Sequence, residues 1–400
     1  MDFDLIISGG GPAGLCLARA LSGHGLRLAV VEQQPLAALE NPPVDGREIA
    51  LTQHSAKVMR DLGLWERIAP QALSPLRDAR VLNGPSPFAM VIGHALGRHS
   101  ELGWLVSNHL IRRASFDAVQ DSMQQNGDIT LLAGETVATV RTDATAAHVT
   151  LASGKTLRAR LLVAADSRFS TTRRAMGIAA DLHDFGRSML VCCMTHDAPH
   201  HHAAWEWFDY GQTLALLPMN DEPGTGLHRS SVVLTLPSHE IEPLLTLAAP
   251  AFNQDMARRF AQRLGPMALA STRHAYPLVA VYPRKLVAQR FACVGDAAVG
   301  MHPVTAHGFN FGLLSIDALA GIVRAAHAGG RDIAETAGLT RYEKGQRRAT
   351  LPLYLATQLI TQLYTRDTPP ARALRNLALH IGERFTPFKR MIAASLTGGH

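Results

Sequence analysis

The sequence predicts an α/β protein organised around a dinucleotide-binding unit near its N-terminus. Three observations predict this: an apolar strand at residues 5–8, a glycine-rich turn at 9–14 that leads into a helix, and a second apolar strand at 26–31. The second strand ends in an acid, Glu32, and this order of elements is typical of dinucleotide binding. A glycine-rich loop at the start of a domain would also account for the glycines, but it would not explain the acid.

The glycines at positions 9, 11 and 14 have the G-x-G-x-x-G spacing, and each has its own physical task. Gly9 allows the tight turn, Gly11 lets a pyrophosphate approach the backbone, and Gly14 lets the helix pack closely on the strand. The helix N-terminus presents unpaired N–H groups and the positive end of its dipole to phosphate. Glu32 is placed to accept hydrogen bonds from a ribose hydroxyl.

Bulk properties narrow the class of protein. A chain of 400 residues is expected to form two linked domains, or one domain with a large insertion. The net charge of +6 favours an anionic cofactor or an anionic membrane surface. Without a focused Lys/Arg stripe or a recognised motif, it does not predict nucleic-acid binding. The four cysteines lack C-x-x-C spacing, and no signal peptide or membrane span is expected, which favours a cytoplasmic protein with reduced thiols.

Composition divides the chain into three regions. Residues 183–276 are β-rich, and we expect them to form a substrate-binding sheet inserted into a dinucleotide-binding domain that comprises 1–182 and 277–340. Residues 341–400 are expected to form a helical C-terminal region. Strands are expected at 129–132, 136–141, 147–151, 156–163, 188–195, 213–217 and 230–236, and helices at 54–69, 111–123 and 310–327.

Two later segments extend the dinucleotide site. An apolar strand at 290–294 is followed by Gly295 and Asp296, and this acid can accept a hydrogen bond from a sugar-chain hydroxyl. A loop at 302–312 then opens a helix whose N–H groups could stabilise negative charge on a heterocycle. Two separated sites for one extended cofactor favour FAD over NAD.

These segments together resemble a known family. The residues at 9–14 with Glu32, the sequence Leu162-Val-Ala-Ala-Asp166 with Ser170 and Arg173, and Gly295-Asp296 with His302-Pro303 and Asn310 are similar to the three fingerprints of class A flavoprotein aromatic hydroxylases. The resemblance covers about residues 3–350 and is strongest to the ubiquinone-biosynthesis hydroxylases. That similarity lies in the segments 45–51, 106–108, 204–208 and 211–218.

The resemblance implies a fold and a set of cofactor contacts. The fold would be a Rossmann-like FAD-binding domain of the GR2 type, as in p-hydroxybenzoate hydroxylase, with an inserted β-rich substrate domain and a helical C-terminal region. The pyrophosphate and the adenosine ribose would be held by Gly9, Gly11, Pro12, Ala13, Gly14 and Glu32. The rest of the cofactor would be contacted by Arg47, Arg112, Val137, Asp166, Gly295, Asp296, Pro303, Gly308 and Asn310.

Three positions depart from the family pattern. Ser167 stands where a glycine usually follows Asp166, so that a positive φ there would strain the backbone. Val299 replaces a common histidine. Ala306 and His307 replace a common Gly-Gln pair, so that the loop beside the flavin gains a titratable group.

The implied reaction is FAD-dependent hydroxylation of a polyprenyl phenol or quinol in ubiquinone biosynthesis, of the 5-demethoxyubiquinol type and at one or several ring positions. It would use O2 and NAD(P)H or another electron donor, and it needs no metal. No catalytic base is assigned: His302 and His307 are the candidates, and a structural role is the alternative for each. The histidines at 196 and 200–202 lack a matching metal-ligand set. A flavin-dependent reductase of prenyl chains and a non-catalytic FAD-binding subunit of a biosynthetic complex remain as alternative functions.

The C-terminal segment carries a separate prediction. Beyond Pro370, apolar residues recur near helical spacing, and residues 366–400 hold six basic against two acidic side chains. A basic amphipathic helix of this kind can lie on anionic lipid, which would place the protein peripherally on the inner face of the membrane, or it can pack on the protein's own core. Other ubiquinone-biosynthesis proteins are further candidate partners.

Overall fold

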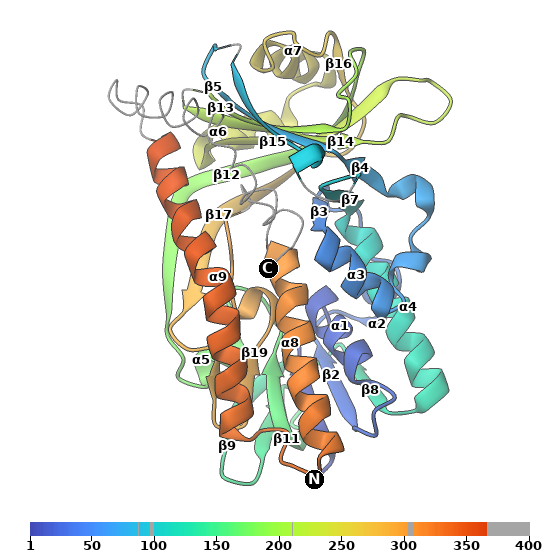
Figure 1. The fold of residues 1–400 in the computed structure, drawn as a ribbon, viewed down its shortest axis with the longest axis vertical. Helices are drawn as coiled ribbons and strands as arrows, with labels where there is room; N and C mark the ends of the chain where they lie inside the picture. Colours follow the sequence, from blue (N-terminus) through green and yellow to red (C-terminus); the bar gives the residue numbers. More distant parts are fainter. Residues whose placement is uncertain (87, 97–99, 210, 303–307, 366–400) are drawn as a thin grey trace.

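The protein is built from two large β-sheets joined end to end, with helices packed on them (Figure 1). The computed structural model describes residues 1–86, 88–96, 100–209, 211–302 and 308–365. The prediction of a helical C-terminal segment beyond 365 therefore lies outside the described residues, as do Pro303, Ala306 and His307.

The first sheet contains the dinucleotide-binding unit. Its order is β18–β19–β11–β1–β2–β8, with β10 and β9 continuing from β11. The strands β19, β11, β1, β2 and β8 pair in parallel, whereas β9, β10 and β11 form an antiparallel meander. The bounds are β1 (Phe3–Ser8), β2 (Leu28–Glu32), β8 (Ile129–Ala133), β9 (Val137–Thr142), β10 (Ala147–Leu151), β11 (Thr156–Ala164), β18 (Val287–Ala288) and β19 (Phe291–Cys293).

Helices cover this sheet and bury its apolar strands. In β1, Leu5, Ile6 and Ile7 are fully buried, and each such side chain stabilises the fold by about 1.5–3 kcal/mol. Helix α1 contacts α4 and α8, and α8 contacts α9. The helices are α1 (Pro12–Leu21), α2 (Leu36–Glu40), α3 (Gln53–Asp61), α4 (Asn108–Asn126), α5 (Thr171–Ala175), α8 (Gly308–Ala328) and α9 (Thr336–Thr365).

Helix α3 is shorter than the sequence predicts, and helix α8 is unusually long and apolar. The predicted helix at 54–69 ends at Asp61, because Gly63 adopts a left-handed φ of +73°, and a short 3-10 turn at Trp65–Arg67 follows. Helix α8 is by length and composition apolar enough to cross a membrane. Just over half of this apolar stretch is buried, where α8 packs on α1 and α9, and the core helix of a globular domain has the same composition.

The second sheet lies beyond the carboxyl ends of the first sheet's parallel strands (Figure 1). Its order is β16–β12–β15–β14–β13–β5–β6, with β17 also paired to β12. Residues 78–93, which precede the predicted insertion, contribute β5 and β6 to it. The bounds are β5 (Asp78–Asn83), β6 (Ala89–Gly93), β12 (Ala180–His196), β13 (Ala203–Asp209), β14 (Gln212–Met219), β15 (His228–Pro237), β16 (Met267–Leu269) and β17 (His274–Pro283).

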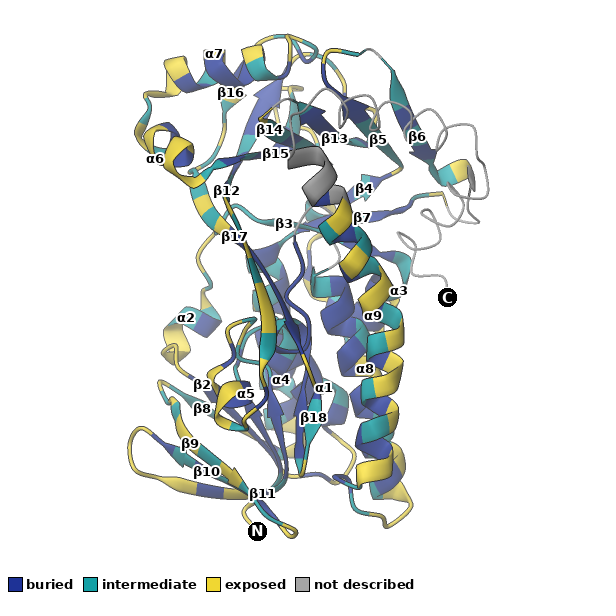
Figure 2. Ribbon diagram, turned by 90° about the vertical axis from the view of Figure 1, so that its left-hand side faces the viewer, coloured by how far each residue is buried: buried dark blue, intermediate teal, exposed yellow. Residues whose placement is uncertain are grey.

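The long strands β12 and β17 connect the two halves of the molecule (Figure 2). The outer face of the second sheet is covered by α6 (Ser238–Thr246) and α7 (Ala249–Arg259), which bury a separate apolar core. A three-stranded sheet of β3 (Glu48–Thr52), β7 (Gly103–Ser107) and β4 (Ser74–Leu76) lies between the large sheets. The remaining short turns are Pro70–Ala72, His94–Leu96 and Gly295–Ala297.

Candidate FAD and substrate site

A cavity of about 610 Å³ lies between the two large sheets. Four of its lining segments directly follow parallel strands of the first sheet, after β1, β2, β11 and β19. The opposite wall is the inner face of the second sheet. Ligands of open α/β sheets bind outside the carboxyl ends of the strands, so this cavity lies where the sequence predicts the cofactor.

The glycine turn has the geometry that its spacing predicts. Gly9 adopts a φ of +111°, and a Cβ there would lie 2.5 Å from the carbonyl oxygen of Ala165. A Cβ on Gly14 would lie 1.8 Å from the carbonyl oxygen of Gly9, so only glycine lets α1 pack on this turn. At Gly11, which caps α1, a Cβ would meet no atom within 4 Å. The space in front of Gly11 is therefore open toward the cavity and free for a phosphate group.

Glu32 is held at the edge of the same cavity by two backbone donors. Its Oε2 accepts from the N–H of Gly10 at 2.6 Å and its Oε1 accepts from the N–H of Gln34 at 2.8 Å. Each oxygen keeps a further lone pair, so a ribose hydroxyl could still donate to this carboxylate. The side chain of Arg112 donates to Gln34 Oε1 at 3.1 Å, and Arg112 also lines the cavity.

Val137 lies at the start of β9, two residues beyond a turn at Gly134 and Glu135 that is hydrogen-bonded to the end of β2. The N–H of Gly134 donates to the Gln34 carbonyl and the N–H of Glu135 donates to the Glu32 carbonyl. The turn therefore lies beside the end of β2, where an adenosine bound to Glu32 would lie. The backbone contact to adenine that the resemblance implies for Val137 stays a prediction.

Asp166 follows β11 and caps the short helix α5. Its Oδ2 accepts from the N–H and the hydroxyl of Thr172 at 3.1 and 3.0 Å, while its Oδ1 is buried and has no partner among the described residues. Ser170 Oγ accepts from the N–H of Arg173, which donates onward to the carbonyls of Arg168 and Ala297. The second fingerprint thus bonds the first turn of α5, which fixes one carboxylate oxygen of Asp166 and leaves the other without a partner among the described residues.

Ser167 carries the strain that its substitution for glycine predicts. It has a φ of +141°, a region that side-chain-bearing residues rarely adopt. Its Oγ accepts from the N–H of Phe169 at 3.2 Å and its carbonyl accepts from the N–H of Ser170. These local hydrogen bonds hold the turn despite the unfavourable backbone angle.

Asp296 forms an ion pair that sequence reasoning missed. Arg168 donates to Asp296 Oδ2 through Nη2 at 2.9 Å and Nε at 3.2 Å, and to the Val279 carbonyl through Nη1. Gly295 packs so closely on α1 that a Cβ would lie 2.7 Å from that of Ala13. The pair joins the second and third fingerprints at the cavity wall, and Arg168 directly follows the Asp-Ser pair of the second fingerprint.

The N-terminal end of α8 borders the cavity at Gly308 and Gly312. Asn310 is buried, and its amide bonds β3: Oδ1 accepts from the N–H of Thr52 at 3.0 Å, and Nδ2 donates to the Ala50 carbonyl at 2.8 Å. The structure therefore assigns Asn310 a positioning contact between α8 and β3. Val299, the second departure, is fully buried in the main core.

His302 lines the cavity and packs edge-on against Phe185, with ring centroids 4.7 Å apart. Burial, with Arg168 and His183 nearby, lowers the pKa of His302 to about 4. The imidazole is therefore neutral near pH 7 and cannot act there as a cationic acid.

The wall opposite the cofactor segments is mostly apolar. Side chains that alternate along β12, β13, β14 and β15 point into the cavity, while their neighbours point into the core under α6 and α7. Trp207, for example, is buried in that core and donates to the Gly84 carbonyl, whereas Phe208 lines the cavity. The inner face comprises Met189, Val191, Glu206, Phe208, Thr213, Ala215, Leu217, Ser231, Val233 and Thr235.

A polar edge of the cavity is formed by the segment from Asp45 to Glu48. Although burial opposes it, hydrogen bonds from Arg47 and Asn108 hold the pKa of Asp45 below its ordinary value. Arg47 also lies over the ring of Tyr276, 5.2 Å from its centroid. Burial raises the pKa of Glu48 to about 7, although Ser107 donates to it at 2.6 Å.

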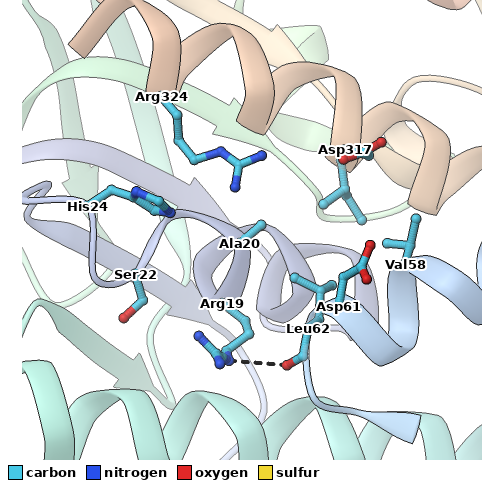
Figure 3. Close-up of a pocket in the computed structure, with 10 residues that line it drawn as sticks. Arg19, Ala20, Ser22, His24, Val58, Asp61, Leu62, Asp317 and Arg324 are labelled. Carbon is cyan, nitrogen blue, oxygen red and sulfur yellow. Dashed lines mark hydrogen bonds between the residues drawn. The ribbon is translucent and has the colours of Figure 1, made fainter. Parts of the chain in front are cut away.

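A second pocket of about 210 Å³ lies between α1, α3 and α8 (Figure 3). Its walls carry charges of both signs, Arg19 and Arg324 against Asp61 and Asp317, and Arg19 Nε donates to the Leu62 carbonyl. None of the predicted site residues that the structure describes lines it. It is too small for an extended dinucleotide, and its opposite charges favour no single class of ligand.

The histidines of the second sheet form a packed cluster. His196 bonds Ala198 O and Ser230 Oγ through its two ring nitrogens, and His200 bonds Met219 O and the N–H of His202. Both nitrogens of each ring are therefore engaged within the protein. Within the described part of the chain, no group of three or more His, Cys, Asp or Glu side chains could hold a metal ion.

The residues around the large cavity fit FAD. An open space faces Gly11 at a helix N-terminus, the carboxylate of Glu32 keeps free lone pairs, and Asp166 Oδ1 has no partner among the described residues. These groups suit, in order, a pyrophosphate, a ribose and a further hydrogen-bond donor of the cofactor. The fold and site define a flavoprotein, and the apolar inner face of the second sheet forms the rest of the same cavity.

The comparison with protein families agrees. Residues 2–350 match the family described as FAD binding domain, so the chain belongs to this family. FAD is therefore the cofactor, as the fingerprints predict.

Similar proteins narrow the group. Ubiquinone hydroxylase UbiM of Neisseria meningitidis is 42% identical, covering 99% of this chain and 84% of that protein. Ubiquinone hydroxylase UbiL of Rhodospirillum rubrum is 33% identical, covering 99% and 89%. The predicted resemblance to ubiquinone-biosynthesis hydroxylases is confirmed. The sequence from Gly295 to Gly308 looks most like the UbiM branch of this group, and the 42% identity to UbiM supports that resemblance.

Solved structures agree on the fold. The p-nitrophenol 4-monooxygenase PnpA of Pseudomonas putida has a TM-score of 0.76 at 18% identity, covering 98% of both chains. The predicted α/β fold with a Rossmann-like FAD-binding domain is confirmed.

Proposed function

We propose that this protein, an FAD-dependent monooxygenase of ubiquinone biosynthesis, hydroxylates the aromatic ring of a polyprenyl phenol or quinol at one or more positions. Its second substrate is O2. The observation that supports this best is one continuous cavity that reaches from the phosphate cradle at Gly11 to the apolar inner face of the second sheet. Such a cavity brings an apolar ring to the cofactor and excludes water from both.

The roles of the chain's own residues follow from their positions. The α1 N-terminus and the glycine turn would hold the pyrophosphate, Glu32 the ribose, and Asp166 and Asp296 the stretch toward the flavin. Bound FAD, once reduced, supplies the oxygen-activating chemistry. The second sheet would hold the ring and shield it from solvent through side chains such as Val191, Phe208 and Val233. We further propose NAD(P)H as the reductant.

Complementation tests the proposal. The gene would be expressed in bacterial strains that each lack one ring hydroxylase of ubiquinone synthesis, and the quinone intermediates would be measured by mass spectrometry. Rescue of one strain would identify the ring position, and rescue of several would support a broad-specificity hydroxylase. If no strain is rescued although yellow, FAD-loaded protein is present, the proposed substrate is wrong.

The same experiment separates the alternative functions. A reductase of prenyl chains would change the saturation of the side chain and would not depend on oxygen. A non-catalytic FAD-binding subunit would give no product by itself, but its presence could restore product when partner proteins are expressed with it.

We propose also that the protein is cytoplasmic and binds the inner face of the membrane peripherally. Leu351, Leu355 and Leu359 are 36%, 49% and 68% exposed and recur at the i, i+4 spacing of one face of α9. Thr361 of the same helix lines the cavity. An apolar surface beside the cavity suits a substrate that is drawn from a lipid bilayer.

Co-sedimentation with liposomes tests the membrane proposal. Replacing Leu355 and Leu359 with serine should reduce binding to anionic liposomes at least fivefold, and deleting residues 366–400 should abolish it. Leu182→Ser is the matched control, because Leu182 is 59% exposed on β12 and not on α9. Equal binding by the double variant and the control would contradict a role for this face of α9.

A further inference from the structure

One carboxyl group on the inner face of the second sheet has no hydrogen-bond or ion-pair partner in the part of the chain that the structure describes. Glu206 lies in β13 and lines the cavity, and no hydrogen bond or ion pair joins its side chain to any described residue. Its strand neighbours Trp205 and Trp207 point to the other face, where Trp207 is buried in the core. The pleat of β13 therefore aims Glu206 at the cavity.

The residues directly opposite Glu206 on both adjoining strands are apolar. In the register of the sheet, Glu206 is opposite Ala215 of β14 and Val81 of β5, and the same row continues through Val233 to Val191. The charged residues Asp78 and Arg80 of β5 alternate with Val81 and so point to the opposite face. A carboxyl group without a partner in an apolar row costs folding free energy, so packing of the sheet does not explain why a glutamate stands at this position.

Burial alone raises the pKa of Glu206 to about 8. Its side chain retains partial surface exposure because the cavity itself borders it. The other charged or titratable groups that line the cavity are Glu32, Arg47, Glu48, Arg112, Asp166, Arg168, Arg187, Asp296 and His302. Of these, Arg187 donates to the Gly211 carbonyl, Arg168 pairs with Asp296, and Glu48 accepts from Ser107.

We propose that Glu206 is the catalytic residue that accepts the hydrogen bond, and then the proton, of the substrate's ring hydroxyl. This inference rests on the proposed function. The proton moves from the ring oxygen to a carboxylate oxygen of Glu206, which leaves a phenolate and a neutral carboxylic acid, and no group is oxidised or reduced. A phenolate ring is richer in electrons than a phenol and so accepts an electrophilic oxygen more readily.

The chemistry of the two groups favours this role. A phenol has a pKa of about 10 and an ordinary glutamate one of about 4.3, so an exposed carboxylate is a poor acceptor for a phenolic proton. The apolar row around Glu206 raises the pKa of its carboxyl group and so brings it nearer to the pKa of the phenol. Glu48, the other carboxyl of this cavity with a raised pKa, already accepts a hydrogen bond from Ser107 and lies at the polar edge.

The experiment compares Glu206→Gln with Glu206→Asp, Glu48→Gln and a surface control, Glu240→Gln on the exposed part of α6. The probe is a phenol that carries a two-isoprene side chain. Hydroxylated product and oxygen consumption would be measured between pH 6 and 9.5, with kcat and KM separated. Binding of the probe to the FAD-loaded protein would be measured over the same range by the change in flavin absorbance.

In the wild type and in Glu240→Gln, kcat should rise with pH and level off above the pKa of Glu206. In Glu206→Gln the rise should be absent and kcat at the plateau should fall at least 30-fold, with KM within threefold and FAD content unchanged. Oxygen consumption without product should increase correspondingly. Glu206→Asp should retain a shifted rise, which separates loss of the carboxyl group from misfolding.

Three outcomes would overturn the proposal: an unchanged pH profile in Glu206→Gln, loss of the rise in Glu48→Gln instead, or equal pH dependence of probe binding in wild type and Glu206→Gln. The binding measurement stands apart from turnover. If the wild type binds the probe but forms no product, the proposed function fails, while the pH dependence of binding still decides the role of Glu206.

Discussion

Replacing Gly11 with alanine separates cofactor binding from folding. Gly11 has an ordinary φ of −70°, and an added Cβ would meet no protein atom within 4 Å. The apoprotein should therefore be unchanged or about 0.4–1 kcal/mol more stable, because alanine restricts the unfolded chain. The methyl group would nevertheless occupy the space that lets a pyrophosphate reach the backbone N–H groups.

The cost to FAD binding can be worked out from those hydrogen bonds. Loss of one charge-assisted hydrogen bond costs about 1.5–3 kcal/mol, which corresponds to a roughly 10- to 150-fold increase in the Kd for FAD. Gly14→Ala is the matched comparison. Its Cβ would lie 1.8 Å from the carbonyl oxygen of Gly9, so α1 would have to move away from β1 at a cost of about 1–3 kcal/mol.

The assay combines urea denaturation of flavin-free protein with titration of FAD fluorescence. Gly11→Ala should unfold at the wild-type urea concentration or slightly above it and bind FAD weakly, whereas Gly14→Ala should unfold at a lower concentration. If Gly11→Ala binds FAD as tightly as the wild type, the reasoning about the phosphate space is wrong. If Gly14→Ala is as stable as the wild type, the reasoning about helix packing is wrong.

Three further predictions concern single residues. Ser167→Gly should stabilise the protein by about 1 kcal/mol, because relief of the strained φ outweighs the entropic cost of glycine. Ser153→Gly, at a turn position without a positive φ, should not stabilise the protein, and thermal denaturation would distinguish the two variants. Glu32→Gln should weaken FAD binding and cost about 1–3 kcal/mol of stability, since an amide N–H₂ would face one of the two backbone donors; unchanged denaturation and titration curves would contradict the role of these hydrogen bonds. Burial lowers the pKa of His200 to about 4, below its ordinary value, so the unfolded chain binds the proton more readily than the folded protein does. The free energy of unfolding should be highest above about pH 6.5 and fall by up to about 1.4 kcal/mol per pH unit as the pH drops toward 4. Urea denaturation of His200→Gln should show a shallower fall.

The sequence carries most of the information about the cofactor half of the site. The glycines at 9–14, Glu32, Asp166 and Asp296 all lie at the carboxyl ends of parallel strands, because a G-x-G-x-x-G turn and an apolar strand determine local geometry wherever they occur. The strain at Ser167 was also predictable, since it depends on one backbone angle.

The rest depends on contacts between segments distant in the chain. Arg168 pairs with Asp296 across 128 residues, and β5 joins β13 in the second sheet from a segment more than a hundred residues earlier. Asn310 bonds Thr52 and Ala50 of β3, a contact across more than 250 residues that its motif does not indicate, and its implied contact with the cofactor stays a prediction. The isolation of Glu206 follows from the register of five strands, and no local pattern in the sequence reports that register.

The most direct test of the central claim is isotopic. Purified, FAD-loaded protein would be supplied with reductant, a short-chain polyprenyl phenol and ¹⁸O₂, and the product would be analysed by mass spectrometry. A monooxygenase places one ¹⁸O atom in the ring for each hydroxylation, and the label should be absent when ¹⁶O₂ and H₂¹⁸O are used instead. Product labelled from water, or no product from protein that binds both FAD and the phenol, would contradict the account.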